Sequence, residues 1–518
     1  MAFSIRPTAA ALAAAVLIAL ASASAQAADA PPGQVAKLRK AVTVAGMMRH
    51  EQALQDIATA NGGTRASGTP GYNASVDYVV AKLKAAGYDP VVQPFDFAFF
   101  QELAAPTLAR TAPTAKDYAL DTDFSGMTYS GSGDVTANVQ EVADNQFPPG
   151  ADPSSSNAGC EAADFAGFVP GNVALIQRGT CNFADKALNA QNAGASAVLI
   201  FNEGQEGRTD AIAGTLGSPD FTIPVLGTTF AFGQETHDLL ASGPVTVHVT
   251  SSTVSETRKT YNVLADTKGG DPNHVVVQGS HLDSVVAGPG INDNGSGSAY
   301  NLESAIQVAK QHLNVRNKIR FAWWGAEELN LIGSTFYVDS LSDAQFSKIA
   351  LNLNHDMLAS PNFVRFVYDG DGSDTGTAGP AGSANIEKVF SDYFDSQGLA
   401  TEPTAFDGRS DYGPFIARGA PAGGLFSGAE VVKTPEEAAI YGGTAGVAYD
   451  HCYHQACDDI SNLSQTSFDQ LSDGAATALA TFAFSKKPVT ATTSRKVSRR
   501  TAKQRMARAT YRGSSAQR

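Results

Sequence analysis

The sequence of 518 residues is poor in cysteine, with four, and after its N-terminus it has no run approaching 18 apolar residues. A transmembrane helix is therefore not expected. The chain also has no long low-complexity stretch before its C-terminus, and its hydrophobic content of 43% is ample for a folded core. Because the length exceeds that of one ordinary domain, we expect more than one.

Basic residues are scarce outside the C-terminus. The formal net charge is −14, yet the segment from Lys486 to the end holds eleven Lys and Arg and no Asp or Glu. The rest of the chain therefore carries about −25, which argues against a nucleic-acid partner. We expect residues 486–518 to be a disordered basic tail that is either simply solvated or in contact with an anionic cell surface.

The N-terminus has the pattern of a secretory signal. Arg6 supplies the charge, Ala9–Leu20 the apolar stretch, and Ala21–Ala28 a choice of small residues for cleavage. The apolar stretch is too short and too rich in alanine for a membrane anchor. We expect residues 1–27 to be a signal peptide and the protein to be secreted.

The four cysteines fit an exported protein, because an even number allows two disulfides in an oxidising compartment. Proximity along the chain predicts the pairs Cys160–Cys181 and Cys452–Cys457. The alternative is one zinc site built from all four thiolates. The separation of Cys160 from Cys181 is too wide for the paired ligands of such a site.

The first part of the chain is expected to be helical and then extended. Met48–Ala60 and Tyr72–Ala86 carry apolar residues at helical spacing, whereas Val91–Phe100 alternates like a strand.

The next part, residues 130–255, is rich in Gly, Ala and short Val and Ile runs. The pattern predicts a strand at Asn172–Gln177, a turn with the sequence Arg-Gly-Thr-Cys-Asn-Phe, a helix at Ala184–Ala193 and a strand at Ala197–Asn202. This order resembles the protease-associated (PA) domain. The resemblance implies an accessory domain.

From Tyr261 onward, strand patterns alternate with helix patterns, which predicts an α/β sheet with helices on both faces. The expected strands are Val275–Gly279, Ile319–Trp324, Ile349–Asn354 and Ala422–Phe426, and the expected helices are Ser298–Leu313, Leu331–Ser340, Ala384–Gln397 and Phe468–Ser485. Functional side chains should follow the carboxyl ends of the strands.

The first of these strands leads into His281 and Asp283, and a glycine-rich loop then supplies Asp293. One imidazole and several carboxylates suit zinc or a similar divalent ion. We interpret His281 as a ligand and Asp283 as its orienting partner, since a ligating histidine usually donates its other N–H to a carboxylate or carbonyl. Taken singly, a structural histidine and a helix-capping aspartate would explain the same residues.

Two adjacent carboxylates, Glu327 and Glu328, follow the second strand, and Asp356 follows the third. Buried carboxylates are costly unless a cation holds them. Because neighbouring side chains diverge, one glutamate can bind metal while the other acts as a general base. An ordinary acidic first turn of a helix is the alternative interpretation.

A short loop bracketed by Cys452 and Cys457 completes the set. If the disulfide forms, the loop holds Tyr453 and His454 in fixed directions. His451, three residues before His454, is the alternative ligand.

Together these segments resemble the di-zinc aminopeptidases of metallopeptidase family 28 over roughly residues 45–485. The resemblance implies an α/β fold with a mixed, mostly parallel sheet flanked by helices and an inserted β-rich PA domain. It divides the chain into a peptidase domain at 28–130 and 256–485 and a PA domain at 131–255.

The resemblance also implies a ligand set for two zinc ions, although other divalent ions are possible. His281 and Asp356 would hold the first ion, Glu328 and His454 the second, and Asp293 would bridge the two.

Further roles follow from the same resemblance. Glu327 would be the general base, and Tyr453 would stabilise the oxyanion. Arg409 would help to place the free amine of the substrate, and Met357 and Phe426 would line an apolar specificity pocket.

The expected function is that of a secreted zinc aminopeptidase that acts on peptides and prefers large apolar N-terminal residues. A carboxypeptidase or dipeptidase with the same metal core is the nearest alternative. A one-metal cyclase-type relative or a non-catalytic receptor-like protein is less favoured, because no ligand is missing and the base is present. The oligomeric state is left open.

Overall fold

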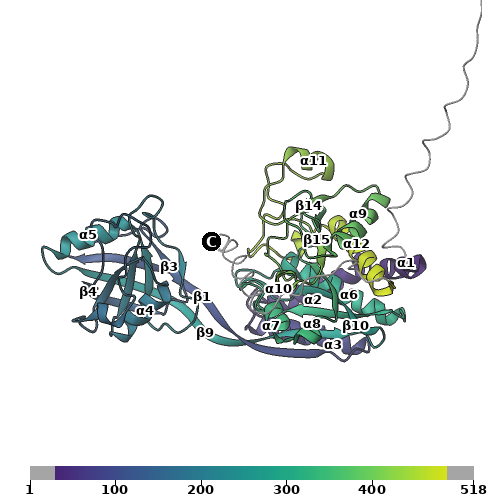
Figure 1. The fold of residues 1–518 in the computed structure, drawn as a ribbon, viewed down its shortest axis with the longest axis horizontal. Helices are drawn as coiled ribbons and strands as arrows, with labels where there is room; N and C mark the ends of the chain where they lie inside the picture. The colour runs from purple at the N-terminus through teal and green to yellow at the C-terminus, as the bar shows by residue number, and fades with distance from the viewer. Residues whose placement is uncertain (1–29, 487–518) are drawn as a thin grey trace, which may run out of the picture. The chain divides into compact units, whose positions relative to one another are not determined.

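The computed structural model describes residues 30–486 (Figure 1). The predicted signal peptide and all but the first residue of the basic tail lie outside the described residues. The described chain forms two compact units, Asp96–Lys259 and the segments 30–95 and 260–486 together. It passes from the first segment into Asp96–Lys259 within strand β1 (Val91–Ala112) and returns within strand β9 (Thr246–Asp266).

The unit made of 30–95 and 260–486 is built on a mixed sheet with the strand order β14-β13-β15-β12-β10-β11-β9. Its strands are β10 (Asp271–His281), β11 (Asn317–Trp324), β12 (Ile349–His355), β13 (Phe366–Tyr368), β14 (Glu402–Thr404) and β15 (Ala422–Phe426). β11, β10, β12 and β15 run parallel, whereas β9 and β13 pair antiparallel with β11 and β15. The predicted fold class is confirmed.

Helices cover both faces of this sheet. They are α1 (Pro32–Ala41), α2 (Val44–Ala60), α3 (Pro70–Ala85), α6 (Gly297–Lys310), α7 (Ile332–Ser340), α8 (Asp343–Phe346), α9 (Ser383–Ser396), α10 (Gly413–Arg418), α11 (Pro435–Tyr441) and α12 (Gln465–Phe484). Successive strand residues point to opposite faces. Val276 and Trp323 join the core under α2, α6, α9 and α12, whereas Val277 and Trp324 join a second core under α7 and α10.

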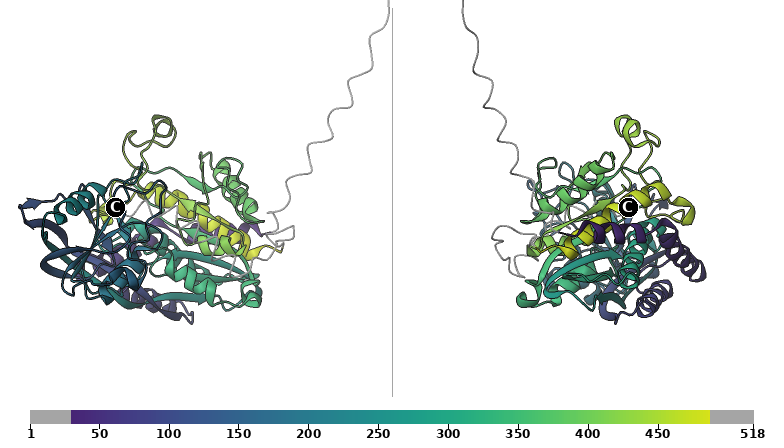
Figure 2. Two further views of the ribbon diagram at one scale, coloured as in Figure 1. Left: turned by 60° about the vertical axis from the view of Figure 1, so that its left-hand side comes forward. Right: turned by 90° about the vertical axis from the view of Figure 1, so that its right-hand side faces the viewer.

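The expected N-terminal helices are confirmed as α2 and α3, and each has a threonine cap. The hydroxyl of Thr43 accepts a hydrogen bond from the amide of Gly46, and that of Thr69 accepts one from the amide of Tyr72. The sequence reasoning missed α1, which packs beside α12 (Figure 2). This pairing brings the two ends of the described chain together.

The unit Asp96–Lys259 has the strand order β9-β4-β5-β6-β8-β3-β7. Its elements are β2 (Lys116–Asp117), β3 (Phe124–Thr128), β4 (Gly133–Glu141), β5 (Val173–Gln177), α4 (Phe183–Asn192), β6 (Ala197–Phe201), β7 (Gly214–Thr215), β8 (Val225–Thr228) and α5 (Phe230–Leu240). Alternate residues of β5 and β6 enter two cores, one under α4 and one under α5. The predicted strands and helix of this region are confirmed.

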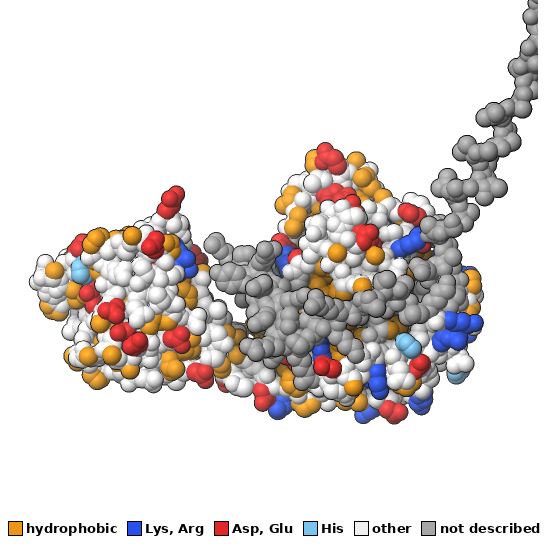
Figure 3. Space-filling model, viewed as in Figure 1, with side chains coloured by type: hydrophobic (Ala, Val, Ile, Leu, Met, Phe, Trp, Pro, Cys, Tyr) orange, Lys and Arg blue, Asp and Glu red, His pale blue; other side chains and the backbone are white. Residues whose placement is uncertain are grey.

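This unit also holds one of the two predicted disulfides and is strongly acidic. Cys160 and Cys181 form a disulfide with an S–S distance of 2.05 Å, as predicted. The unit holds nineteen Asp and Glu against seven Lys and Arg, and Figure 3 shows acidic side chains scattered over its visible face. In residues 30–486, no helix is both long and apolar enough to span a bilayer.

Candidate metal centre

The parallel strands bring the candidate ligands to one edge of the sheet. His281 is the last residue of β10 and pairs with Trp324, the last residue of β11, which leads into Glu327 and Glu328. β12 lies on the other side of β10 and leads into Asp356. Carboxyl ends of neighbouring parallel strands meet at the same edge, so these side chains converge.

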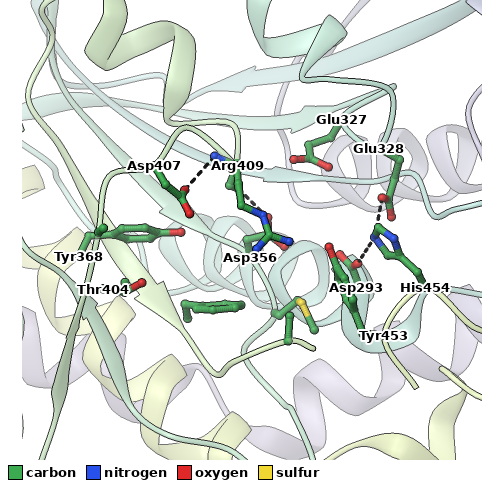
Figure 4. Close-up of a pocket in the computed structure, with 15 residues that line it drawn as sticks. Asp293, Glu327, Glu328, Asp356, Tyr368, Thr404, Asp407, Arg409, Tyr453 and His454 are labelled. Atoms are coloured by element: carbon green, nitrogen blue, oxygen red, sulfur yellow. Dashed lines mark hydrogen bonds and ion pairs between the residues drawn. The ribbon is translucent and has the colours of Figure 1, made fainter. Parts of the chain in front are cut away.

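Asp293 lies between two imidazoles, and Figure 4 shows one of them, that of His454. Its Oδ1 is 3.3 Å from Nε2 of His281, and its Oδ2 is 3.2 Å from Nε2 of His454. His281 Nε2 is also 3.2 Å from Oδ1 of Asp356, and His454 Nε2 is 3.0 Å from Oε2 of Glu328. Each imidazole therefore faces one oxygen of Asp293 and one oxygen of a further carboxylate.

The donor set fits divalent cations. Five carboxylates that are buried or nearly so surround two imidazoles: Asp283, Asp293, Glu327, Glu328 and Asp356. Oε1 of Glu328 and Oδ2 of Asp283 are buried without a hydrogen-bond partner. Buried carboxylates in such excess need cations near them. Ligand atoms of His281, Asp293 and Glu328 lie within 4.8 Å of one another, as do those of His281, Glu327 and Asp356.

The electrostatics of the site also favour bound cations. Although burial lowers the pKa of His281, the carboxylates of Asp356 and Glu327 raise it well above its usual value. Burial lowers the pKa of His454 as well, but the carboxylates of Glu328 and Asp293 raise it to about 11. Carboxylates that favour a proton on these imidazoles also favour a metal cation in its place.

His281 faces the residue predicted to orient it, Asp283, more closely through the main chain than through the side chain. Its Nδ1 lies 3.1 Å from the main-chain carbonyl of Asp283, whereas the Asp283 carboxylate is 3.7 Å away. That carboxylate instead accepts a hydrogen bond from the amide of Glu327 at 3.2 Å. Asp283 thus contacts the histidine through its backbone and the Glu327 turn through its side chain.

The loop bracketed by Cys452 and Cys457 is closed by the predicted disulfide. Its one histidine, His454, reaches the carboxylates of the site, whereas His451, the alternative ligand just before Cys452, is exposed. The ring of Tyr453 stacks on that of His454, with centroids 3.8 Å apart. The loop therefore presents an imidazole and a phenol together.

Ala326, Met357 and His454 have positive φ angles of 55°, 56° and 58°. Non-glycine residues rarely adopt this left-handed conformation, and those that do cluster at functional sites. Each of the three is next to a candidate ligand or catalytic residue, or is itself a candidate. At these three positions the left-handed backbone sets the directions in which the candidate side chains point.

A pocket adjoins the cluster. Tyr453, Arg409, Met357 and Phe426 all line it, as do three residues that the sequence reasoning missed, Tyr368, Thr404 and Asp407. Tyr368 and Thr404 are paired residues at the ends of β13 and β14, so only the sheet order places them here.

Arg409 at the pocket is not isolated. Its Nη1 lies 2.9 Å from Oε1 of Glu430, and both side chains are partly exposed. The guanidinium of Arg409 therefore forms an ion pair with the carboxylate of Glu430.

Other missed residues lie behind the ligands. The hydroxyl of Ser410 donates a hydrogen bond to Asp356, and Asp458 accepts one from the amide of Asp293. Arg65 is fully buried and donates to the carbonyl groups of Leu282, Pro289 and Gly290. Ser410 directly follows Arg409 and Asp458 directly follows Cys457, two residues that the sequence singled out, but nothing local signalled Arg65.

Histidines and carboxylates gathered at the strand ends of an α/β fold are typical of metal-dependent hydrolases. Residues 262–479 match the Peptidase family M28, and residues 140–236 match the PA domain. An aminopeptidase of Pseudomonas aeruginosa is 48% identical over 444 residues, which cover 85% of this chain and 81% of the relative. The chain belongs to peptidase family M28. The predicted family, its PA domain and the predicted class of enzyme, a metalloaminopeptidase, are confirmed.

More distant relatives share the same overall plan. Leucine aminopeptidase 2 of Arthroderma otae is 42% identical over 453 residues, 86% of each chain. The structure of an aminopeptidase from Aneurinibacillus sp. strain AM-1 matches with a TM-score of 0.61 and 28% identity over 88% of this chain and 97% of that one. BSAP, a zinc aminopeptidase from Bacillus subtilis, has a TM-score of 0.52 and 22% identity over 85% and 94%, a likeness of fold.

Proposed function

We propose that this enzyme is a secreted aminopeptidase that uses two zinc ions and prefers large apolar N-terminal residues. The observation that carries the two-metal proposal is the position of Asp293. Its two oxygens face different imidazoles, at 3.3 and 3.2 Å. A carboxylate that faces two imidazoles in this way is suited to bridge two cations.

The proposed ligands divide into two sets. His281 and Asp356 would hold one zinc ion, Glu328 and His454 the other, and Asp293 would bridge them. Imidazole nitrogen and carboxylate oxygen are both good zinc ligands. The relative BSAP is named a zinc aminopeptidase, which supports zinc over other divalent ions.

When bound, the zinc ions would supply Lewis acidity and ease the deprotonation of a water at the site. Glu327 is placed to accept that proton on its carboxylate and to return it to the leaving amine. Burial raises the pKa of Tyr453, so its hydroxyl stays protonated and can donate a hydrogen bond to the developing oxyanion.

The preference for an apolar residue is proposed from the pocket and from the relatives. Met357 and Phe426 line the pocket beside the cluster, and several relatives are named leucine aminopeptidase 2. A guanidinium has no hydrogen-bond acceptor, so Arg409 would help to place the substrate amine through the carboxylate of Glu430.

Secretion is proposed from the N-terminal signal pattern together with the two disulfides. Such bonds persist in oxidising compartments outside the cytosol. Sequencing the N-terminus of the protein recovered from the medium tests this point. A mature chain that begins near residue 28 supports it, and retention of the intact chain in the cell contradicts it.

The central test combines metal analysis with a substrate panel. The purified enzyme should contain about two zinc ions per chain, and chelation should abolish activity. It should cleave a leucyl anilide and leave the matching N-acetyl-leucyl anilide intact. One metal per chain would contradict the bridging role of Asp293, and cleavage of the acetylated substrate would contradict an aminopeptidase.

A further inference from the structure

The carboxylate of Asp458 lies against the main chain that carries Asp293. Its Oδ1 accepts a hydrogen bond from the amide of Asn292 at 2.9 Å, and its Oδ2 accepts one from the amide of Asp293 at 3.0 Å. The main-chain carbonyl of Asp458 accepts a third, from the amide of Ile291 at 3.0 Å. One residue therefore holds three successive residues that end at Asp293.

The same short loop supplies both this anchor and a proposed metal ligand. Asp458 directly follows Cys457, which is joined to Cys452, and His454 lies between the two cysteines. His454 Nε2 is 3.2 Å from Oδ2 of Asp293. The disulfide-closed loop and the residue after it thus touch Asp293 twice, at its side chain through His454 and at its backbone through Asp458.

The environment makes these contacts strong. Asp458 is 1% exposed, and Nδ2 of Asn462 donates a further hydrogen bond to its Oδ1 at 3.1 Å. Three N–H groups thus point at its two carboxylate oxygens, and a buried site strengthens such hydrogen bonds by shielding them from water. An amide at position 458 would turn an N–H₂ donor toward a backbone N–H donor.

We propose that Asp458 is a positioning residue for the metal centre. It fixes the backbone of Asp293 relative to His454, so that Oδ2 of Asp293 and the imidazole of His454 would face the same cation. The inference rests on the two-metal site proposed above.

Asp458→Asn tests this role, with Asp459→Asn as the matched control. Asp459 undergoes the same chemical change one residue away, but its carboxylate contacts Ser461 and not the Asp293 segment. Zinc affinity is measured by competition with a chromogenic chelator. We expect Asp458→Asn to lose about 10- to 100-fold in affinity, the usual effect of removing a group that orients a ligand, and Asp459→Asn to match the wild type.

The outcomes separate the two proposals. A wild-type chain that binds no zinc would overturn the metal centre itself. A wild-type chain with two zinc ions, together with an Asp458→Asn variant that binds them equally well, would overturn only the role of Asp458.

A second measurement does not depend on the folding of Asp458→Asn. In the double variant Cys452→Ser, Cys457→Ser, both zinc ions should be released at lower chelator concentration, because the loop acts on the bridging Asp293 as well as on His454. Release of one zinc ion with wild-type affinity for the other would contradict the proposal. Where both sets of variants fold, their effects on affinity should be less than additive.

Discussion

The hydroxyl of Ser410 donates a hydrogen bond to Oδ2 of Asp356 at 2.5 Å. It leaves Oδ1 of the same carboxylate toward His281, at 3.2 Å from Nε2. Nδ2 of Asn354 in turn donates to the Ser410 hydroxyl at 2.8 Å. The chain Asn354–Ser410–Asp356 therefore sets which oxygen of Asp356 faces His281.

Ser410→Ala should weaken zinc binding through Asp356. We expect about a tenfold loss of affinity, at the low end for removing a group that orients a ligand, because Asp356 keeps its position but loses its fixed rotation. Chelator competition measures the loss, and the melting temperature of the metal-free variant serves as the control for folding. An unchanged affinity in a folded variant would show that Asp356 is oriented without Ser410.

Glu327→Gln should abolish catalysis without removing metal. Glu327 is proposed as the base, so its loss should lower kcat by at least about a hundredfold, the low end for a general base. Zinc content should remain near two per chain. The neighbouring Glu328→Gln is the matched control and should lose zinc, since Glu328 contacts His454 at 3.0 Å. The reverse pattern would exchange the two roles.

The sequence predicted those parts of the site that follow buried strands. His281 ends one buried strand, Glu327 and Asp356 lie just beyond the ends of two others, and the carboxyl ends of parallel strands meet at one edge. Strand period and topology are thus enough to bring these side chains together. The same reasoning yielded the central helices and strands to within a few residues.

The remaining parts of the site depend on contacts that sequence patterns do not encode. Arg65 binds carbonyl groups more than 200 positions away, so no local pattern reports its role. Ala326, Met357 and His454 adopt left-handed backbone although none of them is glycine, the residue that usually marks such a turn in a sequence. Tertiary contacts hold these backbones, and only the folded chain reveals them.

Lys186 provides a pH test in the PA domain. Burial lowers its pKa to about 8 from an ordinary 10.5, and its ammonium donates to the carbonyl of Ala158. Between these two pKa values the unfolded chain binds the proton and the folded chain does not. The free energy of unfolding should therefore rise with pH from about 8 to 10.5.

Urea denaturation followed by circular dichroism measures this contribution. Lys186→Met should flatten the rise across the same pH window. Lys116→Met, at a partly exposed lysine of the same unit, should retain it. A wild-type-like pH dependence in Lys186→Met would assign the rise to other groups.

The two disulfides should act differently, because they close loops of different length and place. Cys452–Cys457 spans 5 positions and brackets His454, whereas Cys160–Cys181 spans 21 in the PA domain. By chain entropy the shorter loop contributes about 2 kcal/mol and the longer about 3 kcal/mol to the free energy of unfolding. The short bridge should therefore act mainly on the position of His454, and the long one mainly on the free energy of unfolding of its unit.

Cys452→Ser with Cys457→Ser should lower turnover and zinc affinity, and should lower the melting temperature less than the loss of the longer bridge does. The Ser pair at 160 and 181 should leave zinc affinity intact and lower the melting temperature of its unit. Activity on a leucyl anilide, chelator competition and thermal denaturation of both variants give the comparison. Normal turnover with a collapsed melting temperature in the first variant would make the short bridge a structural staple. That result would show that the orientation of His454 does not depend on the disulfide. The closed loop would then not explain how the imidazole is held against Asp293.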